Sequence, residues 1–138
     1  MKASNIMTTG VITAGLSTSV GDIVRSLLAN GISAVPVLDE YGALVGIVSE
    51  ADLIHLEASD FLKSHGVKAA DVMTKPVIVA NPEMPLNELV SLFDKHRIKR
   101  VPIVDHGKIV GIVSRANILQ ALALSRKELA HETIADAA

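Results

Sequence analysis

Residues 46–52 read GIVSEAD and residues 111–117 read GIVSRAN, so one seven-residue phrase occurs twice with two changes. The similarity extends outward on both sides of the phrase. GISAVPVLDEYGALVGIVSEADLI at 31–54 corresponds to RIKRVPIVDHGKIVGIVSRANIL at 97–119. The two stretches differ in length only where DEYGAL becomes DHGKI, a change that a hairpin turn tolerates. The chain therefore contains an internal repeat whose strands and helices are kept and whose turn varies.

The repeat also reaches upstream, where NIMTTGVIT at 5–13 corresponds to DVMTKPVIV at 71–79. Two copies of about 60 residues are too few for a solenoid. We therefore expect an α/β fold made of two β-α-β-β-α repeats that pack with pseudo-twofold symmetry. The predicted boundaries are 1–62 for the first repeat, 63–124 for the second and 125–138 for a C-terminal helical tail.

Local signals predict the elements of each repeat. The β-rich runs GVIT (10–13) and PVIVA (76–80) come first. A helix follows, which Ser19 can cap with Asp22 completing a capping box, and which Pro85 can open in the second copy. Apolar residues with helical spacing predict the buried faces of these two helices: Val20, Ile23, Val24, Leu27 and Leu28 in the first, and Leu86, Leu89, Val90 and Phe93 in the second.

Glycine and serine predict where the other elements begin and end. Gly31 is expected to end the first helix. Gly42 and Gly107 are expected at the turns of two hairpins. Ser49 and Ser114 stand where a closing helix should begin in each copy.

Composition limits the class of protein. The 138 residues are 49% hydrophobic but only 2% aromatic, so the core must consist of Val, Ile, Leu and Ala, as in sheets covered by helices. A net charge of −2 argues against bulk electrostatic binding of nucleic acid or of an anionic membrane. Cysteine is absent, which excludes disulfides, thiolate metal sites and a cysteine nucleophile. No signal-peptide pattern and no apolar run near ~18 residues is present, and we expect a soluble cytoplasmic protein.

The paired motifs resemble those of a known family. MT followed by V-I-T, with AVPVLDEYGALVGIVSEADL and RVPIVDHGKIVGIVSRANIL, is similar to the two motifs of a tandem CBS-domain protein, or Bateman module. The resemblance implies two repeats packed sheet against sheet with a cleft on each side. It implies that the clefts bind an adenosine-containing ligand such as AMP, ADP, ATP, S-adenosylmethionine or NAD. It also implies that two modules pair, which predicts a homodimer.

The first copy of the phrase suits a nucleoside phosphate. Ser49 stands at the start of a helix, where a hydroxyl and free backbone N–H groups suit phosphate. Asp52 lies one turn later on the same face and can accept two hydrogen bonds from a ribose diol. The resemblance implies the same roles through the family's S/T-x-x-D motif. The alternative is a capping box in which both residues only stabilise the helix.

The second copy differs in charge. The serine is kept as Ser114, while Arg115 and Asn117 stand where the first copy has Glu and Asp. Just before Val-Pro, the second copy has Lys99 and Arg100 where the first copy has Ser-Ala. We therefore expect two unequal sites, one holding ribose through its Asp and the other holding phosphate through its three cations. An amide can still accept from a hydroxyl, without charge assistance. The alternative for KHRIKR is a solvated helix end, and nucleic-acid binding is disfavoured because no aromatic residues accompany it.

An adenine slot is expected beside the first strand and the hairpin of each repeat, as the resemblance implies. Its predicted walls are Thr8, Thr13, Val35, Thr74, Val79 and Val101. The alternative is that the valines among them are ordinary core residues, because the two kinds of valine look the same in sequence.

The pattern does not predict an enzyme. None of the five histidines has H-x-x-x-H spacing or a triad pattern, and neither a P-loop nor G-x-G-x-x-G is present. We expect no catalytic residue, no metal and no catalytic cofactor. The predicted function is a regulatory module that binds an adenosyl ligand and signals by conformational change. The alternative is a nucleotide-free structural dimerisation or adaptor module that regulates a protein partner.

Overall fold

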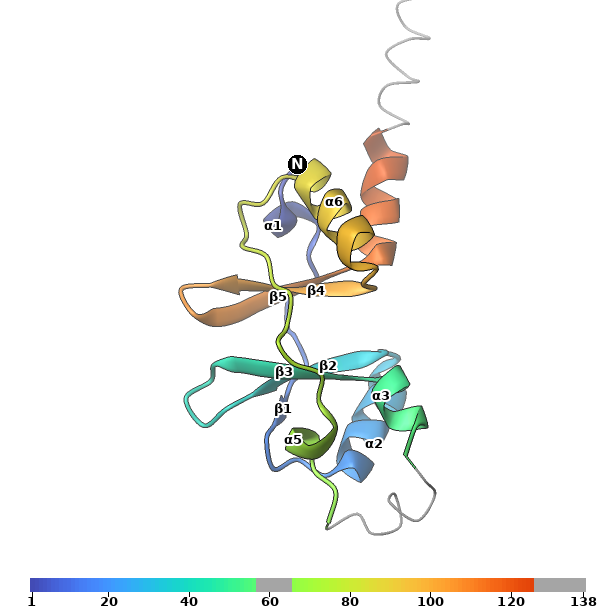
Figure 1. Cartoon of the computed structure of the whole chain (residues 1–138). Coiled ribbons are helices and arrows are strands. Elements are labelled where there is room, and N and C mark those ends of the chain that lie inside the picture. The colour runs from blue at the N-terminus through green and yellow to red at the C-terminus, as the bar shows by residue number, and fades with distance from the viewer. Residues whose placement is uncertain (57–65, 126–138) are drawn as a thin grey trace, which may run out of the picture. The chain divides into compact units, whose positions relative to one another are not determined.

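The computed structural model describes residues 1–56 and 66–125. The chain forms two compact units (Figure 1). The first-repeat unit comprises Ile12–Ile78 with His106–Ile109. The second-repeat unit comprises Met1–Val11, Val79–Asp105 and the residues from Val110 onward. The predicted C-terminal tail lies outside the described residues apart from its first residue.

The first-repeat unit is built on a three-stranded sheet of order β1-β2-β3. Strand β1 (Ala14–Gly15) runs parallel to β2 (Ala34–Leu38), and β2 pairs antiparallel with β3 (Leu44–Ser49). The predicted strand at 10–13 is wrong, because pairing is confined to Ala14 and Gly15. Gly10, the first residue of that run, has a φ of 65°, which interrupts extended backbone there.

Among the described residues of this unit, the sheet is accompanied by helices α2 (Val20–Asn30), α3 (Glu50–Ile54) and α5 (Ala69–Val72). The core gathers alternating residues of the strands and one face of α2. Its buried members are Val20, Ile23, Leu27, Val35, Val37, Val48, Leu53 and Ala69. The α/β prediction is confirmed for this unit, with aliphatic side chains making its core.

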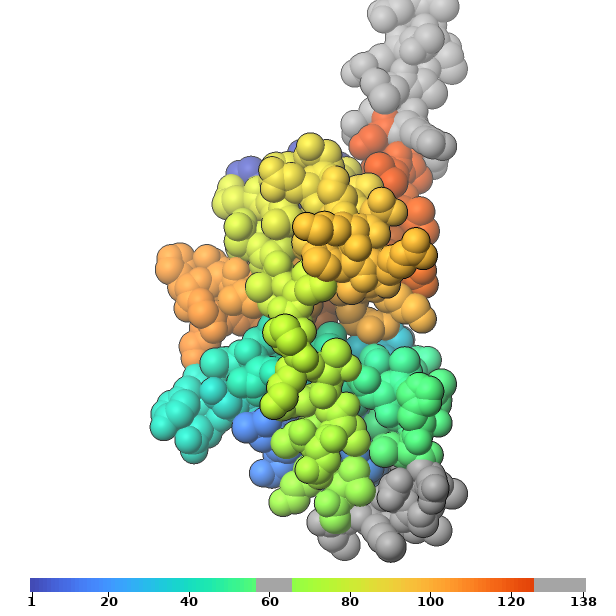
Figure 2. All heavy atoms as spheres, viewed as in Figure 1, coloured from blue at the N-terminus to red at the C-terminus, as the bar shows by residue number. Residues whose placement is uncertain are grey.

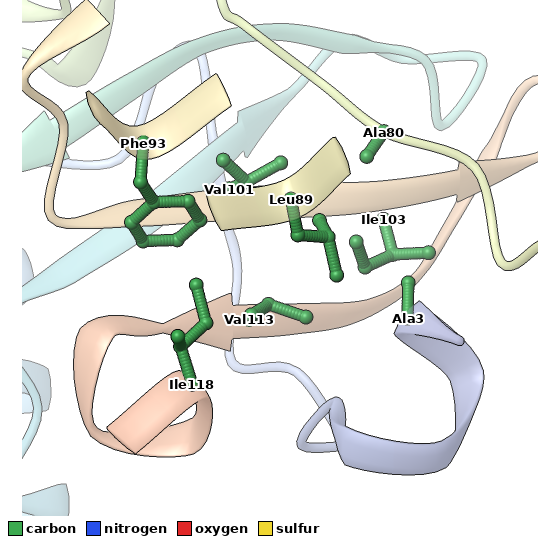
Figure 3. Close-up of a cluster of buried hydrophobic side chains, with 8 residues drawn as sticks. All are labelled: Ala3, Ala80, Leu89, Phe93, Val101, Ile103, Val113 and Ile118. Atoms are coloured by element: carbon green, nitrogen blue, oxygen red, sulfur yellow. The ribbon is translucent and has the colours of Figure 1, made fainter. Parts of the chain in front are cut away.

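The second-repeat unit contains α1 (Ala3–Ile6), α6 (Leu86–His96), β4 (Arg100–Asp105), β5 (Lys108–Ser114) from Val110 onward, and helical residues over 115–125. Strands β4 and β5 form a two-stranded sheet. The predicted strand at 76–80 is wrong: only Ala80 pairs, through one parallel bridge to Ile103. Figure 3 shows the core, in which α6 contributes Leu89 and Phe93 and the other members are Ala3, Ala80, Val101, Ile103, Val113 and Ile118.

The short helices α1 and α5 were not predicted, and they reveal an exchange of segments. The Ala3 N–H donates to the Met84 carbonyl at 2.8 Å, so α1 packs with the second repeat. The Ala69 N–H donates to the Thr18 carbonyl at 2.8 Å, so α5 packs with the first repeat. The segment 66–78 lies at the surface of the first-repeat unit, in yellow-green in Figure 2. The repeat boundaries expected after residues 62 and 124 stay a prediction.

Most predicted caps and turns are confirmed. Ser19 Oγ accepts from the Asp22 N–H at 3.1 Å, Gly31 ends α2 with a φ of 61°, and Pro85 begins α6. The reciprocal half of the first capping box is wrong, because the Asp22 carboxylate pairs with Arg25 instead. That guanidinium bond, together with its positive charge, lowers the pKa of Asp22.

The predicted apolar faces need one correction. Leu27 is 6% exposed, whereas Leu28 is 79% exposed. At 3.6 residues per turn, Leu28 lies about 80° around the helix from Val20, beyond the face that meets the sheet. Val90 on α6 is 37% exposed and sits at the edge of its buried face.

Candidate ligand site at the end of β3

The main candidate site is the corner where β3 ends and α3 begins. Ser49 is the N-cap residue, with extended backbone (φ −116°, ψ 168°). Asp52 Oδ2 accepts from the Ser49 backbone N–H at 2.8 Å and from Ser49 Oγ at 3.1 Å. The Asp52 N–H donates to Ser49 Oγ at 3.4 Å. The capping box that the sequence allowed is therefore formed, and it fixes the orientation of the Asp52 carboxylate.

The second carboxylate oxygen faces another segment of the chain. Thr74 Oγ1 donates to Asp52 Oδ1 at 2.9 Å. Thr74 is held there by two backbone hydrogen bonds with Ile47 on β3, of 2.8 and 3.1 Å. Asp52 is half-buried and Thr74 is exposed, so this hydrogen bond lies near the surface of the unit. Two predicted ligand residues from different sequence repeats are thus brought together across 22 positions.

Thr74 is positioned by the contact between Met73 and Gly46, which we did not predict from the sequence. Met73 packs on Gly46, so closely that a Cβ at residue 46 would stand 2.8 Å from Met73 Cγ. A side chain at residue 46 would push the segment away from β3. The repeated MT and V-G-I-V-S motifs carried this signal, since each copy has the same Met and the same Gly.

The second repeat has a corner of the same construction. Asn117 Oδ1 accepts from the Ser114 backbone N–H at 2.8 Å and from Ser114 Oγ at 2.9 Å. Thr8 pairs with Ile112 through two backbone hydrogen bonds of 2.8 and 3.0 Å, as Thr74 pairs with Ile47. Met7 packs on Gly111 as Met73 packs on Gly46. The repeat therefore extends to these three-dimensional contacts.

The predicted cations lie at this second corner. The Arg115 N–H donates to the Lys99 carbonyl at 3.0 Å, which places their backbones side by side. Both residues are exposed, whereas Arg100 is the first residue of β4 and is partly buried. Helix α6 ends before them, with Lys95 and His96 in its last turn. The helix-end alternative thus applies to Lys95 and His96 more directly than to the three predicted ligands.

The predicted adenine walls fall into two groups. Val35 and Val101 are 1% and 0% exposed and belong to the hydrophobic cores, so neither offers side-chain surface to a ligand in this structure. Thr8, Thr13 and Val79 are exposed. Their contact with adenine stays a prediction, as does ligand contact at every other predicted residue.

The described residues offer neither a metal-binding cluster nor a membrane-spanning helix. Within residues 1–56 and 66–125, no cluster of three or more His, Cys, Asp or Glu side chains is suited to hold a metal ion. In the same part of the chain, every helix is too short or too polar to cross a membrane.

The family of the chain follows from its motifs and its fold. The model of the CBS domain matches twice, at residues 3–59 and 69–124. The protein MJ1426 of Methanocaldococcus jannaschii is 34% identical over 73% of this chain and 79% of its own length. This chain therefore belongs to the CBS-domain family and carries two CBS repeats, as its motifs indicated. It also covers 23% of an inosine-5′-monophosphate dehydrogenase of the same organism, at 33% identity.

Two similar solved structures contain ligands. The structure of CBSX2 in complex with AMP has a TM-score of 0.80 and 31% identity, covering 91% of this chain and 98% of that one. The CBS domain pair of MJ0100, in complex with 5′-methylthioadenosine and S-adenosyl-L-methionine, has a TM-score of 0.78 and 27% identity. That match covers 91% of this chain and 98% of the other. Similar CBS pairs therefore bind adenosyl ligands.

Proposed function

We propose that this protein is a CBS-pair regulatory module, without catalytic activity of its own, that binds an adenosine-containing ligand. The observation that carries the proposal is the Asp52 carboxylate, which Ser49 orients and whose Oδ1 meets Thr74 at 2.9 Å. A carboxylate held in this way can accept charge-assisted hydrogen bonds from the two hydroxyl groups of a ribose. Asp52 is then the ribose anchor of the site.

Similar proteins support the choice of ligand class. CBSX2 binds AMP, and the MJ0100 pair binds 5′-methylthioadenosine and S-adenosyl-L-methionine. These three ligands share adenine and ribose and differ in the group attached to the ribose. Asp52, the ribose anchor, would therefore contact the part that these ligands share. The candidates for the complete ligand are AMP, ADP, ATP, NAD and S-adenosylmethionine.

The proposed mechanism is a shift between conformations. A ligand that binds one conformation of the module more tightly increases its population, by no more than the difference in affinity. We further propose that the protein is a cytoplasmic homodimer and that a protein target responds to this shift. The change in the conformation of the module would alter its contact with that target.

Thermal unfolding with a ligand panel tests the proposal. AMP, ADP, ATP, NAD and S-adenosylmethionine are each added to the wild type, to Asp52→Ala and to Asp71→Ala. Asp71 is a matched control because its carboxylate accepts from the Lys68 N–H at 2.9 Å at another helix start in the same unit. A ligand at 100 times its Kd adds about 2.7 kcal/mol to the free energy of unfolding. The expected rise in Tm is roughly 5–15 °C, retained in Asp71→Ala and lost in Asp52→Ala.

One observation favours a second candidate function. The capping box already engages Asp52 Oδ2, and Thr74 engages Oδ1, so the site residues have a structural role without any ligand. Leu28 and Ile54 are also exposed on the same unit, at 79% and 76%. A panel without any change in Tm at millimolar ligand would contradict the sensor. It would leave a nucleotide-free adaptor that binds its protein partner directly.

A further inference from the structure

Asp52 and Asn117 occupy equivalent positions and make the same pair of capping contacts. Each accepts from the backbone N–H of the serine three positions earlier, at 2.8 Å. Each also accepts from that serine's hydroxyl, at 3.1 Å for Asp52 and 2.9 Å for Asn117. A backbone N–H can only donate, so an oxygen must face the serine in both copies. The orientation of the Asn117 amide is therefore determined by chemistry.

This constraint inverts the hydrogen-bonding character of the other end of the side chain. In Asp52 the remaining group is Oδ1, an anionic acceptor with more than one lone pair. In Asn117 the remaining group is Nδ2, which can only donate. We expected the carbonyl oxygen of Asn117 to accept from a ligand hydroxyl, but it already accepts two hydrogen bonds from Ser114.

The surroundings of the two side chains are otherwise built alike. Thr74 and Thr8 are each paired to a strand through two backbone hydrogen bonds, and a Met packs on a strand Gly beside each of them. The helix starts are also alike: the Glu50 N–H donates to the Ser33 carbonyl at 2.9 Å and the Arg115 N–H to the Lys99 carbonyl at 3.0 Å. The exchange of one oxygen for one NH₂ group thus occurs within a matched backbone frame, although the side chains beside it differ: Thr74 Oγ1 donates to Asp52 Oδ1, and Arg115 stands where the first copy has Glu50.

We infer that the module binds one adenosyl ligand per chain, with its ribose diol at Asp52, and that Asn117 determines this because it offers the hydroxyl protons of a ribose no free acceptor at the second corner. The inference rests on the proposed function and deepens it. At Asp52 the two hydroxyl protons meet a carboxylate. At Asn117 a hydroxyl oxygen can accept from Nδ2, but the hydroxyl protons find no acceptor on this side chain, and protons buried without an acceptor weaken binding.

Isothermal titration of the full chain with AMP tests the inference, using wild type, Asp52→Asn, Asn117→Asp and the double exchange. These substitutions preserve shape, and the chain itself shows that either side chain forms the cap. The wild type should bind one AMP per chain. Asp52→Asn should weaken binding about 10–150-fold, the loss expected for hydrogen bonds to a charged group. Asn117→Asp should bind two, and the double exchange should bind one.

A ligand control ties the effect to the diol. AMP that lacks both the 2′- and 3′-hydroxyl groups should bind wild type and Asp52→Asn with similar affinity. A tenfold or larger difference for this ligand would overturn the assignment of the diol to Asp52.

Other outcomes separate this inference from the proposed function. Two AMP molecules per wild-type chain, unchanged affinity in Asp52→Asn, or one site in Asn117→Asp would each overturn the inference while leaving an AMP-binding module. Absence of AMP binding in all four proteins would contradict AMP as the ligand and this inference together. The thermal panel with the other four ligands then decides whether the proposed function also fails.

Discussion

Met73 packs directly on the backbone of Gly46, where a Cβ would stand 2.8 Å from Met73 Cγ. Met7 and Gly111 repeat this relationship, again at 2.8 Å from Cγ. The contact holds the chain beside the strand and so places Thr74 next to Asp52. A glycine inside a strand, where it normally weakens pairing, is thus explained by close approach of another segment.

Gly46→Ala should lower the free energy of unfolding by about 1–3 kcal/mol, because the new methyl group overpacks against Met73. Gly15→Ala is the matched strand control, since its Cβ would meet only Thr18 Oγ1 at 3.7 Å. Urea denaturation measures both. Combining Gly46→Ala with Met73→Ala should cost less than the sum of the two single changes. Additive costs would show that the two residues do not oppose each other.

Arg97→Gly should stabilise the protein by about 1 kcal/mol. Arg97 ends α6 with a φ of 51°, at the position where Gly31 ends α2 with a φ of 61°. Left-handed backbone is unfavourable for a residue with a Cβ and free for glycine. Lys95→Gly, inside the same helix, should instead destabilise by about 1 kcal/mol. Guanidinium denaturation measures whether the two variants change the free energy of unfolding in opposite directions. A loss of stability in Arg97→Gly would contradict the view that left-handed backbone at Arg97 is unfavourable.

Leu27→Ala and Leu28→Ala should differ sharply although the residues are neighbours. Leu27 is 6% exposed and packs in the core, so its truncation should cost about 2–5 kcal/mol. Leu28 is 79% exposed, so its truncation should stay within about 0.5 kcal/mol. Thermal unfolding of the two variants measures the contrast. Equal destabilisation would mean that Leu28 is covered in solution, as it would be at an interface between protomers.

Ser114→Ala should destabilise by about 1 kcal/mol, because Ser114 Oγ accepts from the Asn117 N–H at 3.2 Å at the start of the helix over 115–125. Ser91→Ala is the control, because the Ser91 hydroxyl donates to the Asn87 carbonyl within α6 at 3.1 Å and caps no helix. Little change in the free energy of unfolding is expected. Urea denaturation compares the two. Similar values for both variants would show that the cap contributes nothing beyond an ordinary surface hydroxyl.

The carboxyl of Asp22 should titrate below its ordinary pKa, because it accepts a hydrogen bond from the Arg25 guanidinium and lies beside its positive charge. A lowered folded-state pKa favours the folded state at pH above the unfolded pKa, and this contribution is lost as pH falls through the folded pKa. NMR titration of Asp22 in the wild type and in Arg25→Gln measures the shift. The pKa should rise in the variant, and an unchanged value would remove Arg25 as the cause.

Local chemistry explains what the sequence by itself determined. The duplicated phrase, the helix starts at Ser49 and Ser114, the turn glycines and the helix end at Gly31 all depend on residues within a few positions of one another. Hydrogen bonds and backbone preferences over that range act in the same way in any fold, so the longer helices, the two hairpins and the family could be read directly. The candidate pair of Ser49 and Asp52 was found for the same reason.

Only the tertiary structure decided which segments join which unit and what each site side chain offers. The strands at 10–13 and 76–80 failed because β pairing needs a partner that sequence does not specify. Thr74 reaches Asp52 through the packing of Met73 on Gly46, a contact between distant segments. Asn117 resembles Asp52 in the sequence, yet its oxygen is committed to Ser114 and it presents a donor. Long-range packing and the obligatory pairing of backbone donors settled these points, since neither is encoded in the spacing of nearby residues.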